Sequence, residues 1–207
     1  MASKITKWFG ALVATGVASY LSVQFIDLPV ANWVHAHPFA RGPIKQFEDL
    51  VLLLVPLGAL ALLIGGFYAF AGRVRPRWLE TSLIASNSLM WSLAAFFFLL
   101  KPAFGRIETS KLFAEPSQYG FVPFHGGYAT AYPSGHSAMI ASVMIVIGLC
   151  HPRLRIVSGL VTLAVMAGLV LIGWHFVADT IGGLFLGATT ALMSKAMWDS
   201  RASGHGP

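Results

Sequence analysis

The sequence predicts an all-α membrane protein, a bundle of six transmembrane helices that forms one domain over residues 1–207. The first observation is composition: 56% of the residues are hydrophobic and 11% are charged, whereas soluble domains carry about 25% charged residues. The second is that the apolar residues gather in runs whose length is close to that of a membrane-spanning helix, about 20 residues. The runs also lack the alternation of barrel strands, so helices must satisfy the backbone hydrogen bonds in lipid.

The predicted spans follow one another along the whole chain. They cover residues 8–26, 49–71, 80–100, 134–150, 156–173 and 176–196. The first follows Lys4 and Lys7, so a cleaved signal peptide is an alternative interpretation of this run. Residues 28–47 are too polar to span, and we expect an amphipathic segment that lies in the membrane interface. A long loop, residues 101–133, joins the third and fourth spans.

The distribution of positive charge predicts the orientation of the bundle. One side holds nine basic residues, which are Lys4, Lys7, Arg73, Arg75, Arg77, Arg153, Arg155, Lys195 and Arg201. The other side holds five, which are Arg41, Lys45, Lys101, Arg106 and Lys111. Because Lys and Arg collect on the cytoplasmic side of membrane proteins, we expect both termini in the cytoplasm. The loop 101–133 and the turn at residues 173–175 would then face outward.

His175 and Asp179 are four residues apart at the last predicted span, so they share one face of a helix. A carboxylate in that place can hold an imidazole in one tautomer and stabilise its cation, as in an oriented base or nucleophile. A charge near a span is costly unless it has a partner and a role. A structural hydrogen bond between helices is the alternative, because polar pairs also join membrane helices.

The stretch Pro133-Ser134-Gly135-His136 precedes and begins the fourth predicted span. Ser134 suits a helix cap, and Gly135 allows a ligand to approach the backbone closely. Free amides and the positive end of the helix dipole favour an anion such as phosphate, with His136 beside it. Alternatively, these residues form a well-capped helix start without a ligand.

Two cations, Lys101 and Arg106, follow the third span on the same outward side. Either side chain could instead place its charge at the lipid boundary, as Lys and Arg commonly do. Together, however, a cationic pair, a helix N-terminus and a His–Asp pair on one face predict a site for phosphoryl transfer.

These residues resemble the type 2 phosphatidic acid phosphatase (PAP2) superfamily over about residues 95–190. The superfamily has three motifs, K-x6-R-P, P-S-G-H and S-R-x5-H-x3-D. The second is complete here at residues 133–136, and the third ends completely with His175 and Asp179. Residues 119–127, YGFVPFHGG, are also similar to a bacterial subgroup of the superfamily.

The resemblance implies a membrane lipid phosphatase, a phosphoric monoester hydrolase that forms a phosphohistidine intermediate. His175 would be the nucleophile and Asp179 would orient it, while His136 would protonate the leaving alcohol and later activate water. The implied phosphate-binding residues are Lys101, Arg106, Ser134 and Gly135. The resemblance implies that no metal and no other cofactor is needed.

The sequence departs from the superfamily at two arginine positions. The Arg-Pro of the first motif reads Glu-Thr at residues 108–109, and the Ser-Arg of the third reads Gly-Leu at residues 168–169. His125 or Lys111 could supply accessory positive charge. Losing one contact to a transition-state phosphoryl group typically costs about two to three decades in rate, so weak phosphatase activity is expected.

Two other functions are therefore alternatives to the phosphatase. One is a lipid phosphotransferase that passes a head group or phosphoryl group to an alcohol through the same histidines. The other is a catalytically inactive homologue that binds lipid or a partner protein. The expected partners are a lipid phosphate or pyrophosphate and the bilayer, without nucleic acid. The expected location is the bacterial inner membrane, with the active site facing the periplasm.

Overall fold

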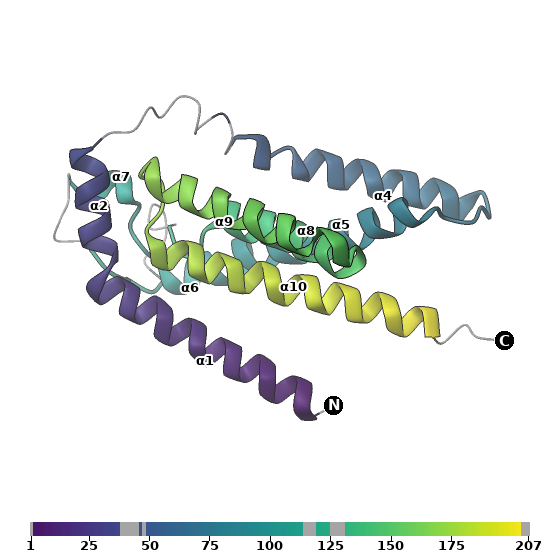
Figure 1. The fold of residues 1–207 in the computed structure, drawn as a ribbon, viewed down its shortest axis with the longest axis horizontal. Coiled ribbons are helices and arrows are strands. Elements are labelled where there is room, and N and C mark those ends of the chain that lie inside the picture. The colour runs from purple at the N-terminus through teal and green to yellow at the C-terminus, as the bar shows by residue number, and fades with distance from the viewer. Residues whose placement is uncertain (1, 38–45, 47–48, 114–118, 125–130, 204–207) are drawn as a thin grey trace.

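The computed structural model describes residues 2–37, 46, 49–113, 119–124 and 131–203, and the regular secondary structure in these parts is helical (Figure 1). The first half contains α1 (Ala2–Phe25), α2 (Asp27–Ala36), α4 (Leu54–Phe70), α5 (Arg77–Ala95), a π-helix (Phe96–Leu100), α6 (Lys101–Phe104) and α7 (Thr109–Leu112). The second half contains α8 (Gly135–Cys150), a 3₁₀ turn (Pro152–Leu154), α9 (Arg155–Leu171) and α10 (Val177–Ser203). In the described residues, extended pairing is limited to one isolated bridge between Arg106 and Phe121. The prediction of an all-α fold is confirmed.

Helix α8 occupies the centre of the bundle and packs against α5, α9 and α10. The long helices run along a common direction, with α4 on one side and α1 on the other, while α2 lies across one end (Figure 1). The N-terminus of α1 and the C-terminus of α10 both lie toward the end of the bundle opposite α2. This arrangement leaves the α2 end of the bundle as the place where several helix starts and turns meet.

Five segments of the described chain are long and apolar enough to cross a membrane. They are Ile5–Phe25, Asp49–Phe70, Arg77–Phe104, Pro152–Leu171 and Val177–Arg201. Helix α8 is apolar but has only 16 residues. The six predicted runs thus correspond to five candidate spans and one shorter, central helix, and the protein is an integral membrane protein.

Glycines on α10 allow α8 to pack unusually close to it. A Cβ atom on Gly183 would lie 2.5 Å from the carbonyl oxygen of Ser134, and one on Gly187 would lie 2.5 Å from that of Ala138. Small residues four apart are a common means of close helix packing in membranes. The backbone N–H of Ser134 also donates to the carbonyl oxygen of Asp179 at 2.9 Å. The starts of α8 and α10 are therefore held together.

The segment 28–47, which we expected to lie in the membrane interface, is partly described. Its first part is α2, which buries Ala31 and Val34. Ala31 belongs to a small apolar cluster with Leu112 and Phe176, so this helix packs on α7 and on the residues before α10. Residues 38–45 and 47–48 lie outside the described parts of the chain.

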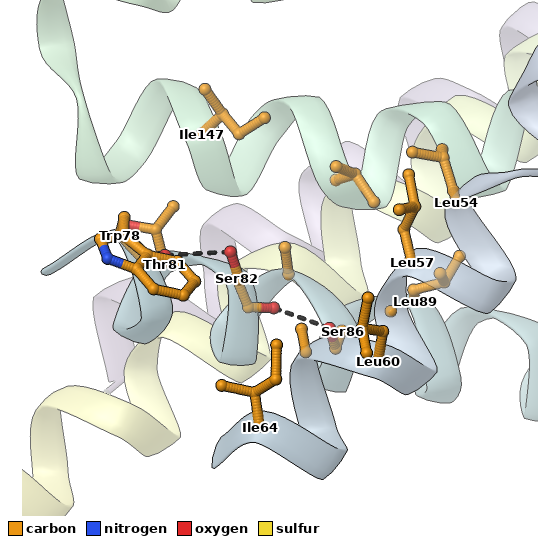
Figure 2. A pocket seen from close by; sticks show the side chains of 14 residues that line it. Leu54, Leu57, Leu60, Ile64, Trp78, Thr81, Ser82, Ser86, Leu89 and Ile147 are labelled. Carbon is orange, nitrogen blue, oxygen red and sulfur yellow. Dashed lines mark hydrogen bonds between the residues drawn. The ribbon is translucent and has the colours of Figure 1, made fainter. Parts of the chain in front are cut away.

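A cavity of about 300 Å³ is lined by residues of α4, α5 and α8 (Figure 2). Its lining is almost entirely apolar, and the hydroxyls of Ser82 and Ser86 donate within α5, to the carbonyl oxygens of Trp78 and Ser82 at 2.9 and 2.7 Å. None of the described residues that line it is charged. We interpret this cavity as a packing gap between lipid-facing helices.

Candidate active site

The turn from α9 to α10 places His175 at the α2 end of the bundle. Helix α9 closes with Gly173 in the left-handed conformation, at φ +73°, which glycine adopts without strain. The N–H of Gly173 bonds to the carbonyl oxygen of Val170 at 3.0 Å, and that of Trp174 bonds to Leu169 at 3.0 Å. Such a glycine ends a helix and reverses the chain within a few residues, so His175 comes immediately before α10.

His175 and Asp179 form the predicted pair. The Nδ1 atom of His175 lies 3.4 Å from Oδ2 of Asp179, a long hydrogen bond. The same Oδ2 accepts the backbone N–H of Phe176 at 2.9 Å. Asp179 is fully buried in the first turn of α10, where the helix dipole stabilises a negative charge. Because Nδ1 faces the carboxylate, Nε2 is the ring nitrogen left for chemistry.

The first turn of α8 presents His136 and two backbone amides. Ser134 caps this helix, with its Oγ accepting the N–H of Ser137 at 3.3 Å. The backbone N–H groups of Gly135 and His136 lie in the first turn, where N–H groups have no carbonyl acceptor within the helix. Nε2 of His136 is buried and has no hydrogen-bond partner among the described residues. This unpaired nitrogen is a group that a substrate oxygen could satisfy.

His136 and His175 line the same cavity, whose volume is about 580 Å³. Its polar part also includes Lys101, Glu108 and the backbone at Gly135. The apolar part is formed by Leu52, Val55, Leu93, Phe96, Phe97, Met139 and Trp174. Convergent polar groups beside an apolar wall are typical of a binding site for an amphiphile.

Lys101 follows the π-helix. Among the described residues that line this cavity, it is the one that carries a positive charge. Its ammonium nitrogen lies 4.4 Å from the centre of the Phe96 ring, a cation–π contact. Glu108, which stands where the superfamily motif has arginine, lines the cavity on the same side. The described lining thus carries one positive and one negative side chain, fewer cations than the complete motifs would give.

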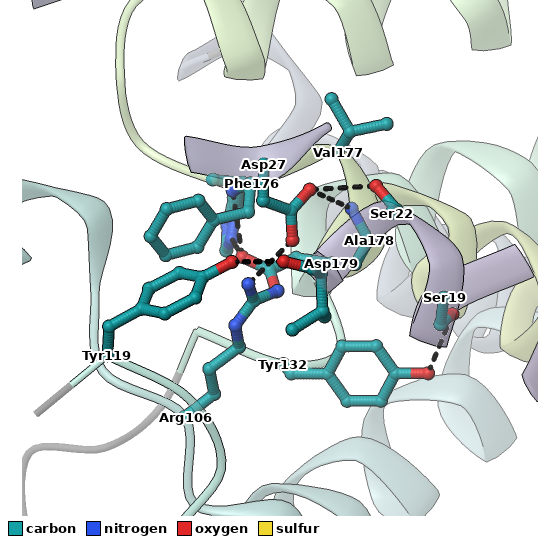
Figure 3. Close-up of polar contacts among 12 residues, drawn as sticks. Ser19, Ser22, Asp27, Arg106, Tyr119, Tyr132, Phe176, Val177, Ala178 and Asp179 are labelled. Atoms are coloured by element: carbon teal, nitrogen blue, oxygen red, sulfur yellow. Dashed lines mark hydrogen bonds and ion pairs between the residues drawn. The ribbon is translucent and has the colours of Figure 1, made fainter. Parts of the chain in front are cut away.

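Arg106 lies in a buried cluster of ion pairs. Its guanidinium is fully buried and bonds through Nη1 to Oδ1 of Asp179 and through Nη2 to Oδ2 of Asp27, each at 2.6 Å (Figure 3). It does not line the cavity of the two histidines. Burial alone would lower the pKa of Arg106, but the charges of Asp179 and Asp27 more than offset it, and the pKa is raised. Arg106 therefore pairs with two carboxylates in this structure, and its expected role in binding phosphate stays a prediction.

The other predicted residues take varied positions. Ser134 is buried as the cap of α8, and Lys111 lies on α7 and does not line the cavity. His125 lies outside the described residues. Leu169, at the missing arginine of the third motif, is fully buried in an apolar cluster with Met139 and Val165.

Sequence reasoning missed Asp27 and Trp174. The ring of Trp174 lies 5.7 Å from that of His136 and forms part of the cavity wall. Asp27 follows the first apolar run directly, and a carboxylate at such a position needs a partner. That signal could have indicated a pairing with a cation from another loop, and Arg106 is that cation.

The fold and the cavity define a class: helical membrane proteins with a His–Asp pair and a second histidine at a helix start. A family model described as the PAP2 superfamily matches residues 49–202. The chain belongs to the PAP2 superfamily.

Two proteins and one solved structure are similar to this chain over most of its length. The chain is 29% identical to a lipid A 1-phosphatase of Rhizobium johnstonii over 209 residues, which cover 93% of this chain and 81% of the relative. It is 28% identical to a lipid A 1-phosphatase of Rhizobium etli, with 93% and 85% covered. Among solved structures, a transmembrane PAP2 type phosphatidylglycerolphosphate phosphatase from Bacillus subtilis matches with a TM-score of 0.53 at 17% identity. That match covers 97% of this chain and 98% of the other, and it supports the fold.

Replacing Glu108 should change the affinity of the cavity for phosphate. We expect Glu108→Gln to bind vanadate, a phosphate mimic, about 3- to 10-fold more tightly, because one negative charge is removed from the cavity of Lys101. Isothermal titration measures this affinity. Glu80→Gln, on the first turn of α5 away from the cavity, is the matched control and should leave the affinity unchanged. Equal affinities of Glu108→Gln and wild type would contradict an anion site beside Glu108.

Proposed function

We propose that this protein is a membrane lipid phosphatase that uses His175 as its nucleophile. The observation that carries the proposal is the shared cavity, in which His136, His175 and Lys101 meet the first turn of α8. The apolar wall from α4 and α5 suits the lipid part of the substrate, since it continues the membrane-facing surface. Membership of the superfamily and the lipid A 1-phosphatase relatives support the same activity.

The first step forms a phosphoenzyme. Nε2 of His175 attacks phosphorus, the bond from phosphorus to the lipid oxygen breaks, and His136 gives a proton to that oxygen. The imidazole ring becomes cationic as the N–P bond forms, and Asp179 stabilises this charge through Nδ1. Lys101 and the amides of Gly135 and His136 bind the phosphoryl oxygens.

The second step releases phosphate. His136, now without its proton, takes one from water as that water attacks phosphorus. The N–P bond breaks, inorganic phosphate leaves, and both histidines return to their starting states. None of these steps requires a redox change or an additional co-reactant.

The relatives indicate which substrate to test first. Their name, lipid A 1-phosphatase, specifies the 1-phosphate of lipid A as their substrate. The cavity volume of about 580 Å³ is enough for a phosphate and part of a sugar or acyl chain, but not for a whole lipid A molecule. The acyl chains would therefore remain in the bilayer beside α4 and α5.

Phosphoryl or head-group transfer to an alcohol is the second candidate function. It is favoured by one observation, the shortage of cations: Glu108 lines the cavity and Leu169 is buried in an apolar cluster. A phosphodiester carries less negative charge than a phosphomonoester and needs fewer cations. Transfer would use the same phosphohistidine, with an alcohol in place of water.

An assay of the purified protein in micelles separates these functions. The panel contains lipid A 1-phosphate, phosphatidic acid, phosphatidylglycerophosphate and an isoprenoid pyrophosphate, with and without an alcohol acceptor. If the protein is a phosphatase, at least one lipid should release free phosphate when no acceptor is present. Product that depends on the acceptor would support the transferase instead, and no product from any lipid would contradict both.

We propose that both termini lie in the cytoplasm of a bacterial cell and that the cavity opens toward the periplasm of the inner membrane. In a Cys150→Ser background, a cysteine at Phe124, which is 80% exposed near the site, should react with a membrane-impermeant maleimide in intact cells. A cysteine at Val74, 93% exposed between α4 and α5, should react only after lysis. The reverse pattern would overturn this orientation.

The role of His136 predicts a dependence on the leaving group. We expect His136→Ala to form a phosphoenzyme from a substrate with a good leaving group, such as p-nitrophenyl phosphate, because that group departs without a proton. With a lipid alcohol as leaving group, the rate should fall about 10²- to 10⁴-fold. Rapid-quench measurements with both substrates test this difference. Equal losses with both substrates would contradict the assignment of His136 as the acid.

A further inference from the structure

A chain of buried charges connects the α1–α2 junction to the candidate nucleophile. Asp27 Oδ2 pairs with Arg106 Nη2, and Arg106 Nη1 pairs with Oδ1 of Asp179, each at 2.6 Å. The remaining oxygen of Asp179 faces His175. The side chains of Asp27, Arg106 and Asp179 are each 0% exposed. Figure 3 shows the part of this arrangement formed by Asp27, Arg106 and Asp179.

The second oxygen of Asp27 is also engaged. Its Oδ1 accepts the hydroxyl of Ser22 at 2.8 Å and the backbone N–H of Ala178 at 3.1 Å. Ala178 belongs to the first turn of α10, the helix that carries Asp179. Asp27 thus holds the catalytic helix twice, through its backbone and through Arg106.

Aromatic rings surround the guanidinium. The centres of the Phe176, Phe121 and Tyr119 rings lie 4.2, 5.2 and 5.7 Å from Cζ of Arg106. These contacts exclude water and restrict the rotation of Arg106, so its two ion pairs keep a fixed geometry. In such surroundings an arginine fork fixes two carboxylates more firmly than a lysine could.

We propose that Asp27 is a positioning residue that acts through Arg106 on Asp179 and so on His175, and this inference rests on the proposed function. The hydrogen bond from His175 to Asp179 is long, at 3.4 Å, so its alignment depends on how firmly the carboxylate is held. Two carboxylates around one guanidinium also leave a surplus negative charge. That charge stabilises the cationic ring that forms when His175 takes the phosphoryl group. Asp27 lies outside residues 49–202, which the family model matches.

A double-mutant cycle tests this role through turnover of a lipid substrate. Asp27→Asn keeps the shape of the side chain but removes its charge, and we expect kcat to fall about 10- to 100-fold. KM should stay within about threefold, because Asp27 does not line the cavity. In an Asp179→Asn background the same change should alter kcat by less than about twofold, since the carboxylate through which it acts is gone.

The control is Ser88→Ala, which removes a buried hydrogen bond between α5 and α10, from Ser88 to Thr190 at 3.2 Å. It should lower the melting temperature and change kcat by less than about twofold in both backgrounds. If Asp27→Asn does not fold, Arg106→Lys replaces it, because a lysine cannot bond both carboxylates.

The outcomes are distinct. Loss of kcat that disappears in the Asp179→Asn background supports the inference. Equal fold losses in both backgrounds, or a rise in KM with kcat unchanged, would overturn it. A wild-type protein that releases phosphate from no lipid would contradict the proposed function itself, whereas an active wild type with additive losses contradicts only the role of Asp27.

Discussion

His175→Ala should abolish turnover of the lipid substrate. In the described lining of the cavity the other imidazole is that of His136, and in the proposed mechanism its Nε2 delivers the proton to the leaving group. We expect a loss of about four decades or more, as when a catalytic triad loses a member. Phosphate release from the preferred lipid measures this effect.

The matched control is His151→Ala. His151 lies at the opposite end of α8, is exposed, and contacts the hydroxyl of Thr81 at 3.2 Å. This variant should keep full turnover and a similar melting temperature. If His175→Ala lowers activity only in proportion to its stability, His175 and Asp179 form a structural pair and the nucleophile is another group.

Arg106→Met should destabilise the protein by about 3–5 kcal/mol, because it leaves the carboxylates of Asp27 and Asp179 buried without their cation. Methionine has a similar length and stays within the same aromatic surroundings, so the loss is mainly electrostatic. Unfolding in mixed micelles with increasing SDS measures the free energy.

The control for this change is Lys195→Met. Lys195 forms an i,i+4 pair with Asp199 on the surface of α10, and such exposed pairs contribute about 0–1 kcal/mol. If Arg106→Met is no more destabilising than this control, the ion pairs of Arg106 with Asp27 and Asp179 do not hold the α1–α2 junction to α10.

Much of the fold could be predicted because lipid imposes strict requirements on the backbone. The apolar run at residues 156–173 corresponds to α9, Arg155–Leu171, and the run at 134–150 to α8, Gly135–Cys150. The role of Ser134 as a cap follows from local backbone chemistry, and a turn was expected at residues 173–175, where Gly173 ends α9. The central position of α8 could not be predicted, because it depends on contacts between distant helices, such as those of Gly183 and Gly187.

The site was predictable where its chemistry is local. The spacing of His175 and Asp179 sets them on one helical face, and their hydrogen bond is present. The partner of Arg106 was not predictable in this way. Asp27 is 79 residues from Arg106, and nothing in the spacing of either residue indicates that they meet. The sequence therefore suggested phosphate for a guanidinium that the fold pairs with carboxylates.

We propose that His175 carries the phosphoryl group during turnover. Rapid-quench mixing of the wild-type protein with a lipid that carries labelled phosphate tests it most directly, with alkaline work-up to preserve a phosphohistidine and mass spectrometry to place the label. We expect label on His175, formed before free phosphate appears and absent from His175→Ala. Phosphate release with no labelled protein, or a labelled protein in His175→Ala, would contradict it.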